Sequence, residues 1–319
     1  MPINIFAYQH GLYPRSERVV AATRSLDRGR VDSGAVDEAF QGDQARFVEV
    51  QQQAGVDFFS DGLIRWQDIF RPLSEAGGPM RSAPLVRWFD TNTFFRAPDL
   101  SQAGAAPSPA GAIVPDRTVP RPAVLSLPSP YMFSRAARVG SRDRNGVMVD
   151  VAERMLAPAI KAAADAGCRL VHLEEPWLAY FGIESGAWAP FKEALSSVRT
   201  PGVTLMLHCY FGDAARYLEE LHGLPVDGIG VDLVETDVAE LGTRWDKDLL
   251  IGCLNGRSSN VESLESTVEL ARRVTDTVRP RNLYLSSTCE LGFLPTTVAE
   301  QKLQRLGEAA KRLKELVSV

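Results

Sequence analysis

Short apolar runs alternate with longer stretches of helical periodicity along most of this chain. Nine runs have the length and composition of strands, at 3–9, 56–62, 85–91, 123–130, 168–176, 203–211, 228–235, 249–256 and 283–292. Between many of them, apolar residues recur at helical spacing, at 37–55, 149–167, 186–198, 213–223 and 263–278. Two of these helical segments end on a glycine just before a strand, the usual C-terminal signal. Repeated strand–helix units predict a parallel sheet.

The length and the repeat together predict one (β/α)8 TIM barrel over residues 1–319, because the chain has no Gly-rich phosphate-binding fingerprint. A barrel needs eight strands, so one of the nine runs is extra. We expect this to be 85–91, because residues 63–122 contain little helical pattern. Residues 101–122 form a Pro/Ala/Gly-rich loop, which we expect to cover a pocket and to be mobile when the pocket is empty.

Composition narrows the class of protein. The chain is 45% hydrophobic and 24% charged, as in ordinary globular proteins, and its formal net charge is −5. Lysine and arginine are scattered, which argues against a nucleic-acid partner. No stretch approaches the ~18 apolar residues that cross a bilayer, and no signal peptide is visible, so no membrane partner is expected. Four widely spaced cysteines are expected to be free thiols in a cytoplasmic protein.

Polar residues collect where the strand-like runs end. They are His10, Asp61, Asp90, Glu174, Glu175, His208, Cys209, Glu235, Asn255, Cys289 and Glu290. In a barrel, functional side chains lie at the C-terminal ends of the strands, so this recurrence predicts a polar pocket there. The alternative for each residue alone is a polar position where a strand meets solvent.

Histidine, carboxylate and cysteine at the ends of successive runs are ligand types that zinc accepts. The residues concerned are His208, Glu235, Cys253 and Cys289. A catalytic zinc site has three protein ligands and one open coordination position. The chain has neither a CxxC nor an HExxH motif. Each cysteine has the alternative of a small buried hydrophobe.

His208 and Cys209 are adjacent, so on a regular strand they point to opposite faces. Cys209 would then pack between strand and helix. It could join a site with His208 only if a bulge at the strand end re-aims it.

Several motifs resemble cobalamin-independent methionine synthase. They are GLYPRSER (11–18), AGVDFFSDG (54–62), RWFDTN (87–92), LEEP (173–176), LPVDGIGVDLV (224–234), GCLNGRSSN (252–260) and SSTCELGFLP (286–295). The family's full-length enzyme has two barrels. Its C-terminal barrel carries zinc and homocysteine, and its N-terminal barrel helps to hold the folate tail. This chain has the length of one barrel and is most similar to the N-terminal one.

The resemblance implies a zinc ligand set of His208, Glu235 and Cys289. Tyr210 stands where the family has its other zinc cysteine, and Cys209 or Cys253 is the alternative thiolate. At several substrate-contact positions this chain differs from the family. Leu12 and Leu63 replace a serine and a glutamate that hold homocysteine in the family. Glu174 stands where the family has an aspartate that contacts the amino group. The family's basic pair for the folate tail falls at about Arg18 and Val19.

The function implied is that of a zinc-dependent methyl- or alkyltransferase acting on a thiol, with homocysteine as one candidate and folate or another methyl donor as co-substrate. Asp61, Asp90 and Glu175 are the candidate acids for the leaving group. The expected substrate contacts are His10, Arg15, Trp88, Asn92, Tyr131, Glu174, Tyr210 and Asn255, with Trp88 and Tyr131 placed to stack on a flat donor ring.

Two other functions fit the same resemblance. One is a metal-free accessory barrel that partners a separate zinc-bearing barrel protein. The other is a metal-independent lyase or decarboxylase related to uroporphyrinogen decarboxylase, although acidic strand ends do not suit a tetrapyrrole polycarboxylate. One tightly bound zinc per chain would distinguish the methyltransferase from both.

Overall fold

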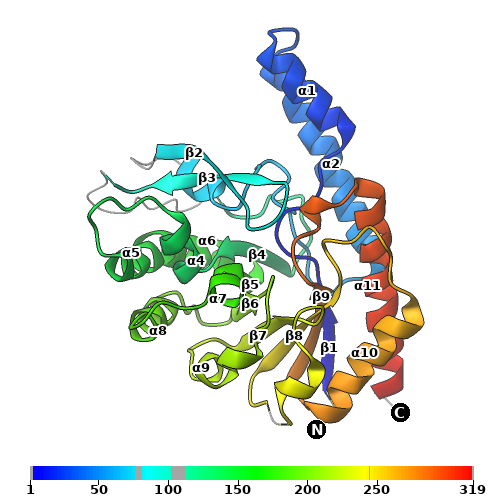
Figure 1. Ribbon diagram of the computed structural model, residues 1–319. Helices are drawn as coiled ribbons and strands as arrows, with labels where there is room; N and C mark the ends of the chain where they lie inside the picture. Colours follow the sequence, from blue (N-terminus) through cyan, green and yellow to red (C-terminus); the bar gives the residue numbers. More distant parts are fainter. Residues whose placement is uncertain (1–2, 76–80, 102–112, 244, 318–319) are drawn as a thin grey trace.

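The structure, a computed structural model, describes residues 3–75, 81–101, 113–243 and 245–317 (Figure 1). Its main sheet has seven parallel strands in the order β1–β9–β8–β7–β6–β5–β4. Their bounds are β1 (Asn4–Ala7), β4 (Ala123–Pro128), β5 (Cys168–Glu174), β6 (Thr204–Cys209), β7 (Gly228–Asp232), β8 (Asp248–Leu254) and β9 (Asn282–Ser287). Strands β4, β7 and β8 are buried at every position, as expected for parallel strands covered on both faces.

Residues 57–59 close this sheet into a barrel. The amide of Asp57 donates to the carbonyl of Ala7 at 2.8 Å, which ties the segment to β1. On its other side, the carbonyl of Phe59 accepts from the amide of Val124 in β4 at 2.9 Å. The segment is therefore a short eighth strand between the two edge strands, and the predicted (β/α)8 fold is confirmed.

The run at 85–91 lies outside the barrel, as predicted. Its first residues belong to β2 (Arg81–Arg87), which pairs antiparallel with β3 (Phe94–Asp99) in a separate two-stranded sheet. This hairpin stands beyond the C-terminal ends of the barrel strands, at the top left of Figure 1. The chain therefore adds a wall above the barrel mouth on that side.

Helices surround the barrel, and two of them extend away from it. Their bounds are α1 (Glu17–Asp27), α2 (Ser33–Ala54), α3 (Arg71–Glu75), α4 (Pro130–Ala136), α5 (Arg144–Val151), α6 (Ala157–Asp165), α7 (Pro176–Phe181), α8 (Trp188–Ser197), α9 (Leu218–His222), α10 (Leu264–Thr277) and α11 (Thr296–Val317). A π-helical turn at Ala152–Leu156 joins α5 to α6. The pair α1 and α2 projects beyond the barrel mouth. None of the helices in the described ranges is long and apolar enough to cross a membrane.

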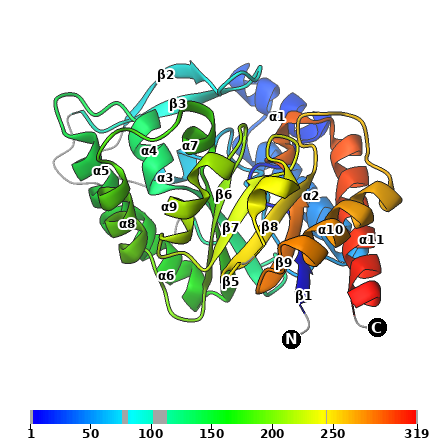
Figure 2. The same ribbon diagram turned by 60° about the horizontal axis from the view of Figure 1, so that its bottom comes forward.

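The barrel interior is filled in two chemically different layers. The lower layer is apolar and aromatic, and it consists of Tyr8, Val124, Leu170, Met206, Leu250 and Tyr284, with Phe6 and Phe58 against it. Side chains two positions further along a strand point to the same face. The inward series therefore continues from Leu170 to His172 and Glu174 on β5, and from Met206 to His208 on β6. Figure 2 shows these strands curling side by side.

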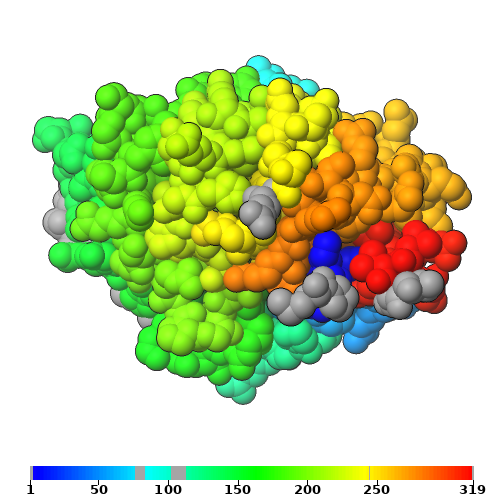
Figure 3. Space-filling view, turned by 90° about the horizontal axis from the view of Figure 1, so that it is seen from below, coloured from blue at the N-terminus to red at the C-terminus, as the bar shows by residue number. Residues whose placement is uncertain are grey.

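The opposite end of the barrel is where the strands begin. Figure 3 views this face, and it shows the start of β1 in blue lying beside α11 in red. The first strand and the last helix thus meet at the base of the barrel. Every candidate site residue discussed below lies toward the other end.

Gly307 marks the closest approach of two helices, α11 and α2. A Cβ on Gly307 would lie 1.8 Å from the carbonyl oxygen of Ala54, at the end of α2. We expect Gly307→Ala to lower the free energy of unfolding by about 2 kcal/mol or more, because backbone must move to relieve the overlap. Urea unfolding followed by circular dichroism measures this loss.

The same substitution at Gly146 is the matched control. Gly146 lies in α5, and the nearest atom to an added Cβ is 3.5 Å away, at an ordinary contact distance. Gly146→Ala should leave stability unchanged or raise it by up to about 1 kcal/mol, through helix propensity. Equal unfolding midpoints for the two variants would contradict the helix contact described here.

Candidate functional site

Three histidines and one glutamate meet inside the barrel, just above its apolar layer. His10 lies three residues after β1, His172 and Glu174 lie on β5, and His208 lies on β6 in register with Glu174. One ligand atom from each lies within 4.8 Å of the others. All four side chains are 0–1% exposed. These four residues are called the His/Glu cluster below.

His10 and Glu174 form a buried ion pair. His10 Nδ1 lies 2.8 Å from Glu174 Oε1, and His10 Nε2 lies 3.3 Å from the carbonyl oxygen of Ser287. Burial lowers the pKa of His10, but the carboxylate of Glu174 outweighs burial and the net pKa is raised. Burial raises the pKa of Glu174, but His10 and His172 outweigh it and the net pKa is lowered. Both His10 nitrogens thus face oxygen atoms, and the carboxylate favours the protonated ring.

Four other atoms of the cluster have no hydrogen-bond partner among the described residues. His172 Nδ1 meets the hydroxyl of Tyr8 at 2.8 Å, but His172 Nε2, Glu174 Oε2 and both nitrogens of His208 have no hydrogen-bond partner. Burial, followed by the charge of His10, lowers the pKa of His172 to about 4 and that of His208 well below its usual value. Burial therefore favours the neutral form of both rings. Leaving a buried polar group without a hydrogen-bond partner lowers stability by about 1–3 kcal/mol. A bound ion or ligand that contacts these atoms would remove that penalty.

The neighbouring strand makes room for the His208 ring. Gly230 on β7 is in register with His208, and a Cβ at Gly230 would lie 2.8 Å from the imidazole. Any larger residue at 230 would push the ring from its place. The sequence Gly-Ile-Gly at this point therefore has a direct structural reason.

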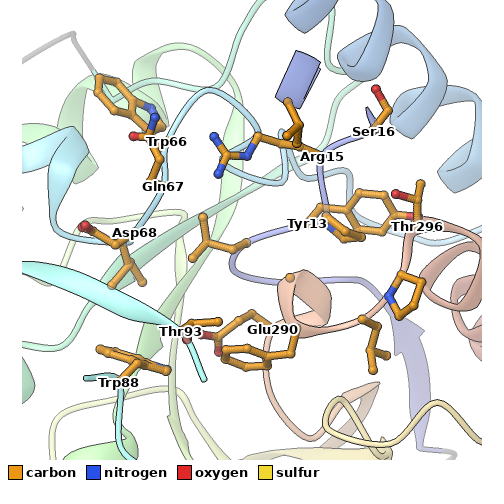
Figure 4. A pocket seen from close by; sticks show the side chains of 18 of the residues that line it. Tyr13, Arg15, Ser16, Trp66, Gln67, Asp68, Trp88, Thr93, Glu290 and Thr296 are labelled. Carbon is orange, nitrogen blue, oxygen red and sulfur yellow. The ribbon is translucent and has the colours of Figure 1, made fainter. Parts of the chain in front are cut away.

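A cavity of about 650 Å³ opens above the cluster at the barrel mouth (Figure 4). Its walls come from the segments that follow β1, residues 57–59 and β9, and from the β2–β3 hairpin. The apolar wall includes Trp66, Trp88, Phe94, Phe95 and Phe293, and the polar groups include Arg15, Glu17, Gln67, Asp68, Glu290 and Thr296. This volume and this mixture suit a small-molecule ligand with a flat apolar part.

Arg15 is the cation of this cavity. Its side chain reaches toward Trp66 and Gln67 in Figure 4, and it makes no hydrogen bond or ion pair with a described residue. Burial and the nearby Arg71 lower the pKa of Arg15, against the attraction of Asp43. An unpaired guanidinium in a partly buried position favours an anionic ligand group.

Glu290 connects the cavity to the buried cluster. It lines the cavity, and its Oε2 accepts a hydrogen bond from the hydroxyl of Tyr210 at 3.1 Å. The ring of Tyr210 lies 5.2 Å from that of His208. Burial, with the charge of Glu174 in addition, raises the pKa of Glu290 to about 7. At neutral pH this carboxyl can therefore hold or give a proton in the cavity.

Two of the three predicted acids lie away from the cavity. Asp61 lines a separate cavity beside α2 and caps a turn through the amide of Leu63, at 3.0 Å. Asp90 is exposed and pairs with Arg257 at 2.7 Å, and this guanidinium also lies over the ring of Phe211. Asp90 thus fastens the hairpin tip to the loop after β8.

The third predicted acid, Glu175, is buried as a helix cap. Its carboxylate accepts from the amides of Leu178 and Met132 and from the hydroxyl of Ser129, so it holds the starts of α7 and α4 together. Burial raises the pKa of Glu175 to about 7, against these hydrogen bonds. The group has no free face toward the cavity.

Five of the eight predicted substrate contacts lie in the cluster or the cavity, and three lie elsewhere. His10, Glu174 and Tyr210 lie in or against the His/Glu cluster, and Arg15 and Trp88 line the cavity. Tyr131, Asn92 and Asn255 lie outside both. Tyr131 bonds to Gly182 and Glu184, exposed Asn92 accepts from Arg87, and Asn255 makes a turn with Arg257.

The predicted ligand set of His208, Glu235 and Cys289 is not assembled in the structure. Glu235 is exposed on the turn after β7, so its carboxylate does not reach the closed cluster. Cys289 is buried against Gly256, where an added Cβ would lie 2.7 Å from the sulfur. The alternative thiols are also placed elsewhere. Cys209 packs in the outer core and Cys253 lies 3.5 Å from the carbonyl oxygen of Ser286.

His172 is the cluster member that sequence reasoning missed. It lies inside an apolar run, two positions before Glu174, and so on the same strand face. The spacing of His172 and Glu174 could have identified His172 as a site residue, because His208 was predicted on the neighbouring strand.

Part of the predicted cover, residues 102–112 of the 101–122 loop, lies outside the described residues.

Comparisons with known proteins agree with the resemblance in the sequence. Residues 74–279 match the family model described as "Cobalamin-independent synthase, N-terminal domain". The chain is 23% identical over 304 residues to a "Methionine synthase" of Sulfolobus acidocaldarius, with 92% of this chain and 87% of that protein covered. It is 28% identical over 255 residues to a "5-methyltetrahydropteroyltriglutamate--homocysteine methyltransferase" of Herpetosiphon aurantiacus, covering 73% of this chain but 32% of that protein. A B12-independent methionine synthase structure from Shewanella sp. W3-18-1 superimposes with a TM-score of 0.74 at 15% identity, covering 99% of this chain and 100% of that one.

Asp232, at the end of β7, predicts a pH dependence of stability. Burial raises the pKa of Asp232 to about 7, although its Oδ1 accepts from the amide of Val234 at 2.9 Å. The folded protein therefore keeps this proton up to about pH 7, whereas an unfolded chain loses it near pH 4. The contribution of Asp232 to the free energy of unfolding therefore falls across this window as pH rises, by up to roughly 1 kcal/mol per pH unit.

Asp232→Asn removes that titration and keeps an acceptor for Val234. Its free energy of unfolding should fall less steeply between about pH 4 and 7 than that of the unsubstituted protein, by up to roughly 1 kcal/mol per pH unit. Urea unfolding at half-unit pH steps measures both slopes. Below about pH 4 the two proteins provide an internal control, because both are then neutral at this position. Parallel curves would contradict the assignment.

Proposed function

Because the chain belongs to the cobalamin-independent methionine synthase family, we propose that it transfers a methyl group from a donor in the cavity to a thiol. The observation that carries this proposal is the cavity itself. It lies at the C-terminal end of the barrel, holds an unpaired arginine and an aromatic wall, and reaches Glu290. Those features match a donor with a flat ring and an anionic tail.

The apolar wall and the polar groups of the cavity suit the substrates named for the relatives. A pteroylglutamate has a flat ring system and carboxylates, and homocysteine has one carboxylate. Trp66 and Trp88 offer faces and edges to a ring, and Arg15 offers a two-pronged donor to a carboxylate. Leu12 in this cavity departs from the family's homocysteine contacts, so homocysteine is the first thiol to test rather than the assigned one.

Methyl transfer needs a thiolate and a proton for the leaving group. The sulfur forms a bond to the methyl carbon, the bond from that carbon to the donor breaks, and the departing atom takes the electron pair and then a proton. Glu290 is the acid that the cavity offers for this last step, since it lines the cavity and its pKa is raised to about 7. It takes the role that the sequence suggested for Asp61, Asp90 or Glu175.

Zinc is the metal that we propose for thiol activation. A thiol has a pKa of about 8.5, and coordination to zinc deprotonates it at neutral pH. Among the described residues, His172, Glu174 and His208 fit such an ion best, because their unpartnered atoms are buried and mutually close. Tyr210 and Glu290 lie between these residues and the cavity, where a substrate thiol would be held.

An accessory role is the second candidate, and one observation favours it. The matching family model is that of the N-terminal domain, and the chain spans about a third of the long Herpetosiphon relative. In that case the chain would act only when mixed with a separate zinc-bearing barrel. Against this, the Sulfolobus protein of similar length is named as a methionine synthase itself.

Methylation of homocysteine by the purified, zinc-supplied chain, with a methylated pteroylglutamate as donor, tests the proposal. Mass spectrometry should detect the methylated thiol. Glu290→Gln should lower kcat about 100-fold, because a neutral amide cannot give the proton. Absence of methyl transfer to homocysteine and to a panel of other thiols would refute the proposal, and activity that appears only with an added second barrel would support the accessory role.

Arg15→Met tests the anion site separately. It should raise the KM of the carboxylate-bearing substrate about 10-fold or more, because a charged hydrogen bond contributes about 1.5–3 kcal/mol. Arg312→Met is the matched control, since Arg312 is 56% exposed, pairs with Glu315 and lies outside the cavity lining. Equal KM values for the two variants would show that Arg15 does not hold the substrate.

A further inference from the structure

We infer that the His/Glu cluster is a metal site built from imidazole and carboxylate ligands alone, with no sulfur ligand. The inference rests on the proposed function in one respect, because a thiol transferase needs a thiol-activating group. Its evidence and its test concern metal binding only. The ligands assigned are His172, Glu174 and His208, with His10 beside them.

Unpartnered ligand atoms converge in the His/Glu cluster. His172 Nε2 and Glu174 Oε2 lie 3.5 Å apart, and neither has a hydrogen-bond partner in the described chain. Two ligand atoms on a tetrahedral zinc, at about 2.1 Å each, lie about 3.4 Å apart. His208, which has two unpartnered nitrogens, completes the group, since one ligand atom of each cluster residue lies within 4.8 Å of the others.

Contacts behind these atoms hold the ligand side chains in place. The hydroxyl of Tyr8 lies 2.8 Å from His172 Nδ1, so the Nδ1 proton can point to Tyr8 and leave the Nε2 lone pair for a metal. Histidine ligands usually donate their other ring proton in this way, and the contact fixes the ring. His10 holds Glu174 Oε1 at 2.8 Å, which orients the carboxylate and leaves Oε2 free.

The cysteine sulfur atoms do not belong to the His/Glu cluster. Cys209 follows His208 on β6 and therefore points to the opposite face, into the outer core. Cys289 lies against Gly256, and Cys253 against the carbonyl of Ser286. The assigned ligands are therefore two imidazoles and one carboxylate, with no sulfur atom among them. Zinc, cobalt(II) and iron(II) are the divalent ions that such a ligand set accepts.

Metal titration of chelator-treated protein tests the site without any assay of activity. Isothermal titration calorimetry with Zn²⁺, Co²⁺ and, under anaerobic conditions, Fe²⁺ should show one ion per chain, and will rank the three metals. The cobalt form should lack the intense near-ultraviolet band that sulfur ligands give. His208→Ala and Glu174→Gln should each weaken binding at least 100-fold, and Tyr8→Phe 10- to 100-fold through the lost contact to His172.

Cys289→Ser and Cys209→Ala are the matched controls, and both should bind metal within about threefold of the unsubstituted protein. Circular dichroism identifies any variant that fails to fold. For such a variant, the cobalt spectrum of the unsubstituted protein decides the ligand type on its own. A sulfur-to-cobalt band, loss of metal in Cys289→Ser, or failure to bind any of the three ions would overturn the inference. One bound ion with these properties supports it even in a protein that transfers no methyl group, so the two proposals fail separately.

Discussion

The backbone hydrogen bonds of residues 57–59 are the constraint on which the rest of the molecule depends. They join β1 to β4 and so remove both free edges of the sheet. Closure also separates the interior from solvent, which is why four polar side chains there are almost completely buried. Inside such an enclosure, electrostatic interactions are stronger than in water, and an unpaired polar atom is expensive. The chemistry of the His/Glu cluster is therefore a consequence of the closed ring of strands.

Strand alternation then decides what the enclosure contains. The inward positions of β5 run from Leu170 through His172 to Glu174, and those of β6 run from Met206 to His208. Each strand thus passes from an apolar floor to a polar upper layer within a few residues. The apolar floor anchors the strands by ordinary packing, and the upper layer is free to carry charge. The cavity above adds an unpaired cation and a carboxyl group whose pKa is near neutrality.

Sequence patterns predicted the barrel, the extra strand-like run at 85–91 and the end of the barrel that carries polar groups, because these follow from periodicity. They also pointed to His10, Glu174 and His208, which the structure brings together. They did not find His172, which is hidden in an apolar run, and they placed Glu235 with His208, although the turn after β7 carries Glu235 outward. Asp90 and Glu175 read as acids, but one fastens a loop and the other caps helices. Such roles depend on which neighbours a side chain meets, and neighbours distant along the chain are not visible in its pattern.

The β2–β3 hairpin supplies Trp88, Phe94 and Phe95 to the cavity, yet it belongs to a sheet of its own. Its tip is fastened to the barrel mouth through side chains, Asp90 to Arg257. A change in the length or sequence of this hairpin therefore reshapes one wall of the cavity without shifting the register of any barrel strand. The architecture in this way separates the frame of the barrel from the shape of its cavity. The barrel strands are held by their hydrogen-bond ladder, whereas an insertion in the hairpin can alter the cavity wall without breaking that ladder.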